Sequence, residues 1–108
     1  MARTLLTVAV AIGISFSTNA KPPAAWLSGG DGSSLEKAIV VHAPNESAGV
    51  DAEHAYIAKH FGYSKSIKVN IELYQHKTRG VFDIFRFVGR DGKKHTVYFD
   101  VNSYIGRF

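Results

Sequence analysis

Residues 67–101 read IKVNIELYQHKTRGVFDIFRFVGRDGKKHTVYFDV, and the alternation within this stretch decides the fold. Residues 67–76 alternate apolar and polar side chains with a period of two, as a strand with one buried face does. Residues 81–88 are apolar on both alternating sets, which is typical of a strand inside a sheet. Asp91-Gly92 is a strong hairpin signal, and residues 95–101 alternate again. The stretch predicts a three-stranded antiparallel meander.

Residues upstream of the meander predict one strand and one helix. The β-branched run Ile39-Val40-Val41 indicates a strand over residues 35–43, and a polar connection follows over residues 45–49. Residues 50–61 place an apolar stripe on one side of a helix, and Gly62 is a stop signal. The stripe is formed by Val50, His54, Ile57, Ala58 and Phe61. The predicted fold class is α+β, with one helix packed on an antiparallel sheet in the order β-α-β-β-β.

The first twenty residues have the layout of a signal peptide. Arg3 supplies a positive charge, residues 5–14 are an uncharged and mostly apolar run, and Thr18 and Ala20 are small residues before a cleavage site. A ten-residue run is too short to span a membrane, which takes about 20 residues. We expect cleavage between Ala20 and Lys21, and a protein that is periplasmic or secreted.

The mature chain would then be a flexible leader followed by one domain. Residues 21–34 carry two prolines and three glycines, so they predict an extended, mobile leader, with Trp26 and Leu27 pinning it to the domain. The single domain follows over residues 35–108. Without residues 1–20 the chain has 12 basic and 9 acidic residues, and no run of Lys or Arg exceeds two. That charge is too diffuse to indicate nucleic-acid binding, and the absence of cysteine leaves stability to the core.

The five histidines do not form a recognisable metal motif. His54 and His60 are six residues apart, so they point about 240° apart around a helix and cannot hold one ion together. No HExxH motif and no paired cysteines occur. We predict no metal and no cofactor, and we interpret His54, on the apolar stripe, as a packed histidine.

Charged residues on the meander leave an enzymatic alternative open. A small exported ribonuclease needs a general base, a general acid and cations that hold the phosphate. Glu72, Arg86 and His95 are candidates to meet across the meander, with His76 as a fourth. Charge pairing between neighbouring strands explains the same residues without catalysis, and we favour it.

Aromatic residues give the stronger functional signal. The alternation places Tyr74 and Tyr98 on the sheet face away from the helix, together with either Phe85 and Phe87 or Phe82. Aromatic side chains mixed with charged ones are typical of protein-binding surfaces. The predicted binding face comprises Tyr74, Tyr98, Phe85, Phe87, Arg86 and Lys68. The alternative is that the N-terminal leader or the C-terminal tail folds over this face and buries it.

Two segments resemble the PepSY family of small domains found in protease propeptides and in exported bacterial proteins. They are the helix end AYIAKHFG over residues 55–62 and the run DGKKHTVYFDV over residues 91–101. The resemblance implies an inhibitory or regulatory binding module without catalysis.

The sequence thus favours a non-enzymatic exported module that binds a protein, as an inhibitor or regulator of an envelope or secreted enzyme. The alternatives are a small exported hydrolase such as a ribonuclease, and a structural protein that associates with itself through an open sheet edge. A homo-oligomer is compatible with each of these functions.

Overall fold

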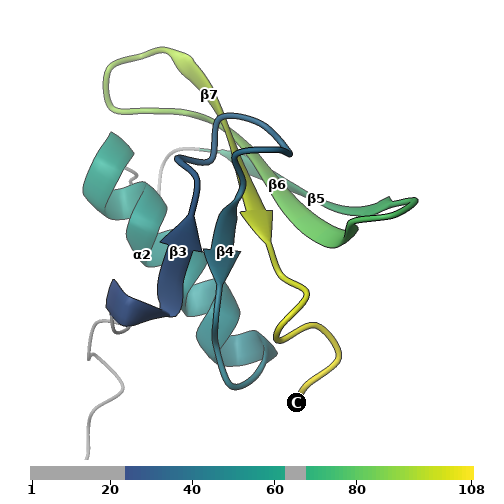
Figure 1. The fold of residues 1–108 in the computed structure, drawn as a ribbon. Coiled ribbons are helices and arrows are strands. Elements are labelled where there is room, and N and C mark those ends of the chain that lie inside the picture. The colour runs from purple at the N-terminus through teal and green to yellow at the C-terminus, as the bar shows by residue number, and fades with distance from the viewer. Residues whose placement is uncertain (1–23, 63–67) are drawn as a thin grey trace, which may run out of the picture.

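A computed structural model describes residues 24–62 and 68–108 of the chain. One helix, α2 (Glu46–Phe61), lies against one face of a five-stranded sheet (Figure 1). The strands are β3 (Leu27–Gly29), β4 (Ile39–Val41), β5 (Val69–His76), β6 (Gly80–Val88) and β7 (Lys94–Asp100), and one turn of 3-10 helix, η2 (Ala24–Trp26), precedes β3. The predicted α+β class is confirmed. The predicted signal peptide and its cleavage site lie outside the described residues.

The sheet has the strand order β3-β4-β7-β6-β5. β5, β6 and β7 form the predicted antiparallel meander. The prediction of a wholly antiparallel sheet was wrong, because β4 runs parallel to β7, with Ile39 beside Phe99. The helix returns the chain to the end of the sheet where β4 began, so β5 runs in the direction of β4. Two hairpins later β7 again has that direction, and the sheet is mixed.

The stretch predicted as a mobile leader contains an ordered strand. β3 pairs antiparallel with β4, and Leu27 lies beside Val41. The carbonyl of Trp26 accepts a hydrogen bond of 2.7 Å from the His42 backbone, and Trp26 and Leu27 pack against the core. A three-residue strand next to glycine is too short to show an alternating pattern. The sequence therefore indicated that Trp26 and Leu27 anchor the segment, but it did not indicate a strand.

Helix α2 begins four residues before its predicted start. The Asn45 side chain accepts a hydrogen bond of 2.9 Å from the Ala48 backbone, which caps the helix. Gly62 ends it in the left-handed conformation, with φ of 69°, and its N–H donates to the Ala58 carbonyl. Residues 45–49 were predicted as a polar connection, and their last residue, Gly49, disfavours helix by propensity. In the structure the ring of Tyr104 packs so closely on Gly49 that no side chain fits there.

The core lies between α2 and the middle of the sheet. β6 is buried on both faces, as its sequence predicts, and Phe85 and Phe87 point toward the helix. The core is made of Ile39, Val41, Ala43, Ala52, Ile57, Phe85, Phe87, Val97, Phe99, Val101 and Tyr104. β5 lies at the margin of this core: Ile71 and Leu73 face the helix side but are 46% and 61% exposed. No helix among the described residues is long and apolar enough to cross a membrane.

Candidate functional site

The strand register arranges the sheet face away from α2, here called the outer face, in rows across β5, β6 and β7. One row consists of Asn70, Arg86 and Thr96, and the next consists of Glu72, Ile84 and Tyr98. Tyr74, Phe82 and Asp100 form the row after that. At the other end, beyond Asn70, Val88 lies beside Lys94. The outer face is therefore basic at one end and carries an acidic group toward the other.

A hollow of about 410 Å³ occupies the basic end of the outer face. Its polar side chains come from the beginning of β5, the end of β6 and the beginning of β7, which the antiparallel register brings together. This basic hollow is lined by Lys68, Asn70, Arg86, Val88, Lys94 and Thr96, with Phe87 and His95 at its border.

The basic hollow carries positive charge that the described residues neutralise only in part. Nη1 of Arg86 donates a hydrogen bond of 2.8 Å to Oε1 of Glu72 on the neighbouring strand. Both side chains are about half exposed, so this ion pair adds little stability and mainly fixes the guanidinium in place. Lys68 and Lys94 have no ion pair with any described residue. Two ammonium groups therefore remain free to meet an anion.

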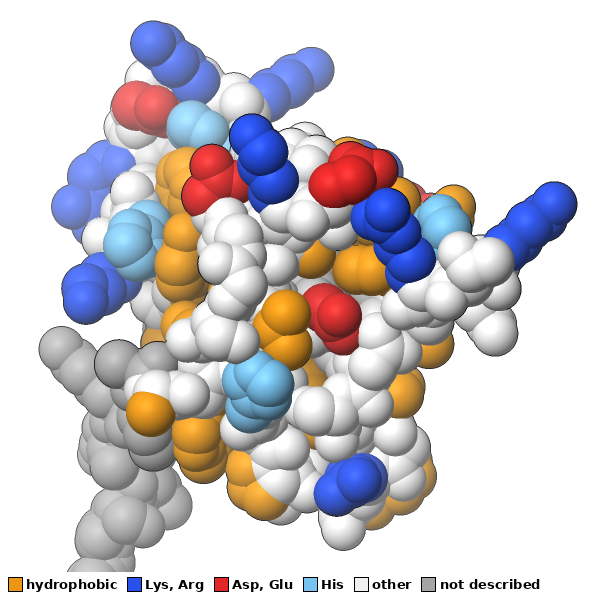
Figure 2. Space-filling view, in the orientation of Figure 1, with side chains coloured by type: hydrophobic (Ala, Val, Ile, Leu, Met, Phe, Trp, Pro, Cys, Tyr) orange, Lys and Arg blue, Asp and Glu red, His pale blue; other side chains and the backbone are white. Residues whose placement is uncertain are grey.

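A second hollow, of about 500 Å³, lies nearer the centre of the outer face. Figure 2 looks onto this face and shows a carboxylate in a hollow among hydrophobic side chains. Val40 and Phe82 form its floor with Asp100, whose carboxylate accepts hydrogen bonds from the backbone and the side-chain amide of Asn102, at 3.0 and 2.7 Å. Both hydrogen bonds reach Oδ1 and come from a neutral residue, and Asp100 has no ion pair with any described residue.

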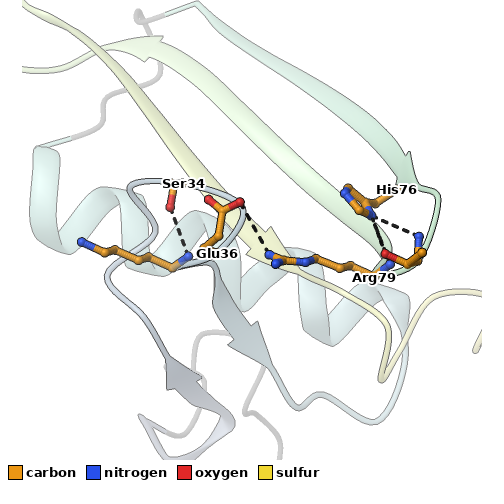
Figure 3. A network of polar contacts seen from close by, with 6 residues as sticks. Ser34, Glu36, His76 and Arg79 are labelled. Carbon is orange, nitrogen blue, oxygen red and sulfur yellow. Dashed lines mark hydrogen bonds and ion pairs between the residues drawn. The ribbon is translucent and has the colours of Figure 1, made fainter.

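The loop over residues 30–38 forms one wall of the central hollow. Figure 3 shows Glu36 of this loop reaching Arg79 in the turn between β5 and β6, with the charged atoms 3.7 Å apart. His76 holds that turn in shape, because its Nδ1 accepts hydrogen bonds from the backbones of Thr78 and Arg79. The loop therefore partly covers the aromatic floor instead of leaving it open.

The structure divides the predicted binding face between the two sides of the sheet. Lys68, Arg86, Tyr74 and Tyr98 belong to the outer face, as predicted. Phe85 and Phe87 were assigned to it wrongly, since they point to the helix and are buried in the core. Because β6 is apolar on both faces, its alternation alone does not say which set meets the helix. Phe82 is the phenylalanine on the outer face, and it is buried as well.

The four residues of the hydrolase alternative are not gathered at one point. Glu72 pairs with Arg86, and His76 lies at the opposite end of β5. Nε2 of His95 lies 3.0 Å from Asp91 Oδ2, and its ring packs between Phe61 and Phe87. The backbone N–H of Lys93, and then His95, lower the pKa of Asp91. Arg86 and His95 border the same hollow, yet each is already paired with a carboxylate.

A serine on β3 and a histidine immediately after β4, which the sequence did not single out, are in contact. Oγ of Ser28 lies 2.8 Å from Nε2 of His42, across the register of the two strands. A catalytic serine also needs a third group that orients the histidine. Among the described residues no carboxylate bonds to His42, so the contact is a cross-strand hydrogen bond.

The interior contains an acidic pair that the sequence did not reveal. Glu53 of α2 is completely buried, and neither carboxyl oxygen has a hydrogen-bond partner in the described part of the chain. Burial, followed by the neighbouring Asp83, raises the pKa of Glu53 to about 10. The hydroxyl of Tyr104 donates a bond of 3.2 Å to Asp83, and burial raises the pKa of this tyrosine too. Glu53 is thus a neutral acid at physiological pH, held beneath the surface.

Residues 24–62 and 68–108 contain no group of three or more histidine, cysteine, aspartate or glutamate side chains placed to hold a metal ion. His54, predicted to be a packed histidine, lies with its ring edge against Phe85, at a centroid distance of 5.3 Å. No protein-family model, curated protein or solved structure matches the chain. The resemblance to PepSY domains therefore stays a prediction.

Proposed function

We propose that the chain is a non-enzymatic, exported protein-binding module that holds an acidic surface of its partner against the basic hollow. The partner is an envelope or secreted enzyme, which the module inhibits or regulates. The observation that carries this proposal is the cluster of Lys68, Arg86 and Lys94 around one hollow, with two of the three cations unpaired among the described residues. Such charges steer an acidic partner and fix its orientation.

The composition of the basic hollow supports a protein ligand. Val88, 40% exposed, lies beside Lys94, so an apolar contact is available next to the charges. Arg86 is held in place by Glu72, and a guanidinium recognises carboxylates through paired hydrogen bonds. A mixture of apolar contact, arginine and polar amide or hydroxyl groups is what protein interfaces show.

The same face is less suited to nucleic acid. Single-stranded nucleic acid binds on aromatic side chains that are open for base stacking. Tyr74 and Tyr98 are only partly exposed, and Phe82 is buried. Lys68, Arg86 and Lys94 form one small cluster at one end of the outer face and not a stripe along the described sheet.

Export is the second part of the proposal, and it rests on residues 1–20. The charged start, the apolar run and the small residues before Ala20 are the features that the secretion machinery recognises. The intact mass of the protein accumulated by its native host tests this part, because cleavage after Ala20 leaves Lys21 as the first residue.

Charge reversal at the basic hollow tests the binding site. The chain is immobilised, partners are captured from the host's envelope fraction, and the affinity of the identified partner is then measured with purified protein. We expect Lys68→Glu with Lys94→Glu to weaken binding by about tenfold or more, because each reversal replaces an attraction of about 1 kcal/mol with a repulsion. The matched control is Lys59→Glu with Lys77→Glu, which changes the net charge equally at exposed positions outside the hollow.

If both double variants weaken binding equally, the interaction is unspecific charge attraction and the proposed site is wrong. The enzymatic alternative has its own outcome. If the purified chain binds no envelope protein but cleaves RNA, and His95→Gln abolishes the cleavage, the chain is a hydrolase and the proposed function is wrong.

A further inference from the structure

The free edge of β5 is a second surface, distinct from the basic hollow. β5 ends the sheet, so no described strand pairs with its outer side along eight residues. Its helix-side residues Ile71 and Leu73 are 46% and 61% exposed, although the neighbouring Phe85 is buried. An unpaired strand edge that also exposes large apolar side chains is a template for a further strand.

We propose that the strand that pairs with this edge belongs to a second copy of the chain, joined antiparallel through β5 about a twofold axis. An added strand must offer apolar side chains on the helix side and polar ones on the outer face. β5 has this pattern itself: Val69, Ile71 and Leu73 face one way, and Asn70 and Glu72 face the other. A twofold axis perpendicular to the sheet keeps the two helix sides together.

Charge and exposure select one register for this pairing. With the axis at Ile71, the two Ile71 side chains are opposite each other, Val69 faces Leu73 of the second copy, and Asn70 faces its Glu72. An axis at Glu72 would instead set two carboxylates against each other, which is unfavourable. An axis at Asn70 would leave Leu73, the more exposed residue, opposite a position before β5 begins at Val69.

The pairing places both outer faces on the same side of one continuous sheet. Each copy contributes a basic hollow to that side, and Lys68 lies immediately before β5. The inference does not depend on the proposed function, because it rests on the edge of β5 and not on the lysines.

The mass in solution tests the pairing, using the protein purified from its native host in the form in which it accumulates. Light scattering after gel filtration is expected to give twice the monomer mass. Ile71→Asp places the carboxylates of the two copies opposite each other at the twofold axis. Their repulsion is expected to give the monomer mass. Val88→Asp is the matched control, since Val88 is also an exposed apolar strand residue but lies on β6, away from the free edge, and this variant is expected to stay dimeric.

Single cysteines test the register, because the chain has no cysteine of its own. Residues directly opposite in an antiparallel pair have Cβ atoms about 4.5–5.5 Å apart, a separation that a disulfide bridges with a small adjustment. Ile71→Cys is therefore expected to form a disulfide-linked dimer rapidly under mild oxidation. Leu73→Cys, although more exposed, faces Val69 and is expected to stay largely unlinked.

Three outcomes would overturn the inference. One is a monomer mass for the unchanged chain up to its highest soluble concentration. Another is cross-linking of Leu73→Cys as fast as that of Ile71→Cys, which indicates random collision. The third is a different protein that occupies the edge, shown by loss of a mixed complex in Ile71→Asp. The charge reversals at Lys68 and Lys94 leave the position of the axis unchanged, so failure of one proposal is separable from failure of the other.

Discussion

Glu53 is the residue whose chemistry is most strongly determined by the fold. It is completely buried in α2 beside Asp83, and the pKa of its carboxyl is raised from 4.5 to about 10. Below pH 4.5 the group is neutral in both the folded and the unfolded chain. Between pH 4.5 and about 10 only the unfolded chain loses the proton, so the free energy of unfolding falls as the pH rises. Ionisation in the folded chain above that range would place a charge in the core beside another carboxylate.

We expect Glu53→Gln to remove this pH dependence. One group that is protonated only in the folded state costs about 1.4 kcal/mol of stability for each pH unit. Urea unfolding at pH 6 and pH 8 is therefore expected to show the variant gaining about 2.7 kcal/mol relative to the unchanged chain over these two units. Glu72→Gln, at an exposed carboxylate, is the control and is expected to keep the original slope. Parallel pH profiles for Glu53→Gln and the unchanged chain would show that the buried carboxyl does not hold its proton.

At the scale of elements, the start of α2 depends on a contact from the end of the described chain. Gly49 is the fourth residue of the helix, and the ring of Tyr104 occupies the space that a side chain at this position would need. The close contact lets the aromatic ring reach Asp83 and fill the core. Helix propensity therefore disfavours glycine at position 49, whereas packing against Tyr104 requires it.

Gly49→Ala separates these two demands. In an isolated helix the change would stabilise by about 1 kcal/mol. Here we expect a net loss of about 1–3 kcal/mol in the free energy of unfolding, because the added methyl group overpacks against Tyr104. Ser47→Ala, at an exposed position of the same helix, is expected to stay within about 0.5 kcal/mol. A stabilised Gly49→Ala variant would mean that the ring of Tyr104 moves aside at little cost.

The elements with a long periodic pattern were predictable from the sequence, and the short ones were not. The alternation of the eight residues of β5, the apolar run of β6 and the Asp91-Gly92 turn between β6 and β7 sufficed for the meander. β3 has three residues, and its pairing is decided by β4, which the local sequence does not contain. The four-residue error at the start of α2 arose because Gly49 disfavours helix by propensity, while the residue that packs on it, Tyr104, is distant in the sequence.

The candidate site was predictable only in part, for a related reason. Lys68 was placed on the correct face because it continues the alternation of β5, so its face follows from its parity. Arg86 lies on β6, where parity alone does not identify the face. The sequence does not reveal which face of β6 meets the helix. It therefore could not decide whether Phe82 or the pair Phe85 and Phe87 belongs to the outer face. Lys94 joined the hollow through the hairpin register. Glu53 gave no signal at all, since a glutamate on a helix is ordinarily exposed to solvent.

At the scale of the whole molecule, the segment after β7 ties the two layers together. Tyr104 belongs to the core, and the Ser103 hydroxyl donates to the Val41 carbonyl at 2.5 Å. Glu46, at the start of α2, accepts a side-chain hydrogen bond from the Gly106 backbone and donates its own N–H to the Arg107 carbonyl, each at 2.7 Å. These contacts join β4, α2 and the chain end.

Ending the chain after Asn102 is expected to lower the free energy of unfolding by more than about 3 kcal/mol, because loss of a buried aromatic side chain alone costs about 3–5 kcal/mol. Thermal unfolding followed by circular dichroism measures the loss. Removing only Phe108, which is 99% exposed, is the control and is expected to leave the unfolding temperature unchanged. A stable chain ending at Asn102 would show that the core closes without Tyr104.

The position of Tyr104 also has a consequence for the timing of folding during synthesis. The core joins residues near position 40 to residues near position 100, so β4 is synthesised well before the strand and the aromatic ring that it packs with. While Tyr104 is still inside the ribosome, β4 lacks its central neighbour and α2 lacks the ring against Gly49. A nascent chain in that state has no finished core to resist being threaded through a narrow pore, which is the condition that transport across a membrane in unfolded form requires.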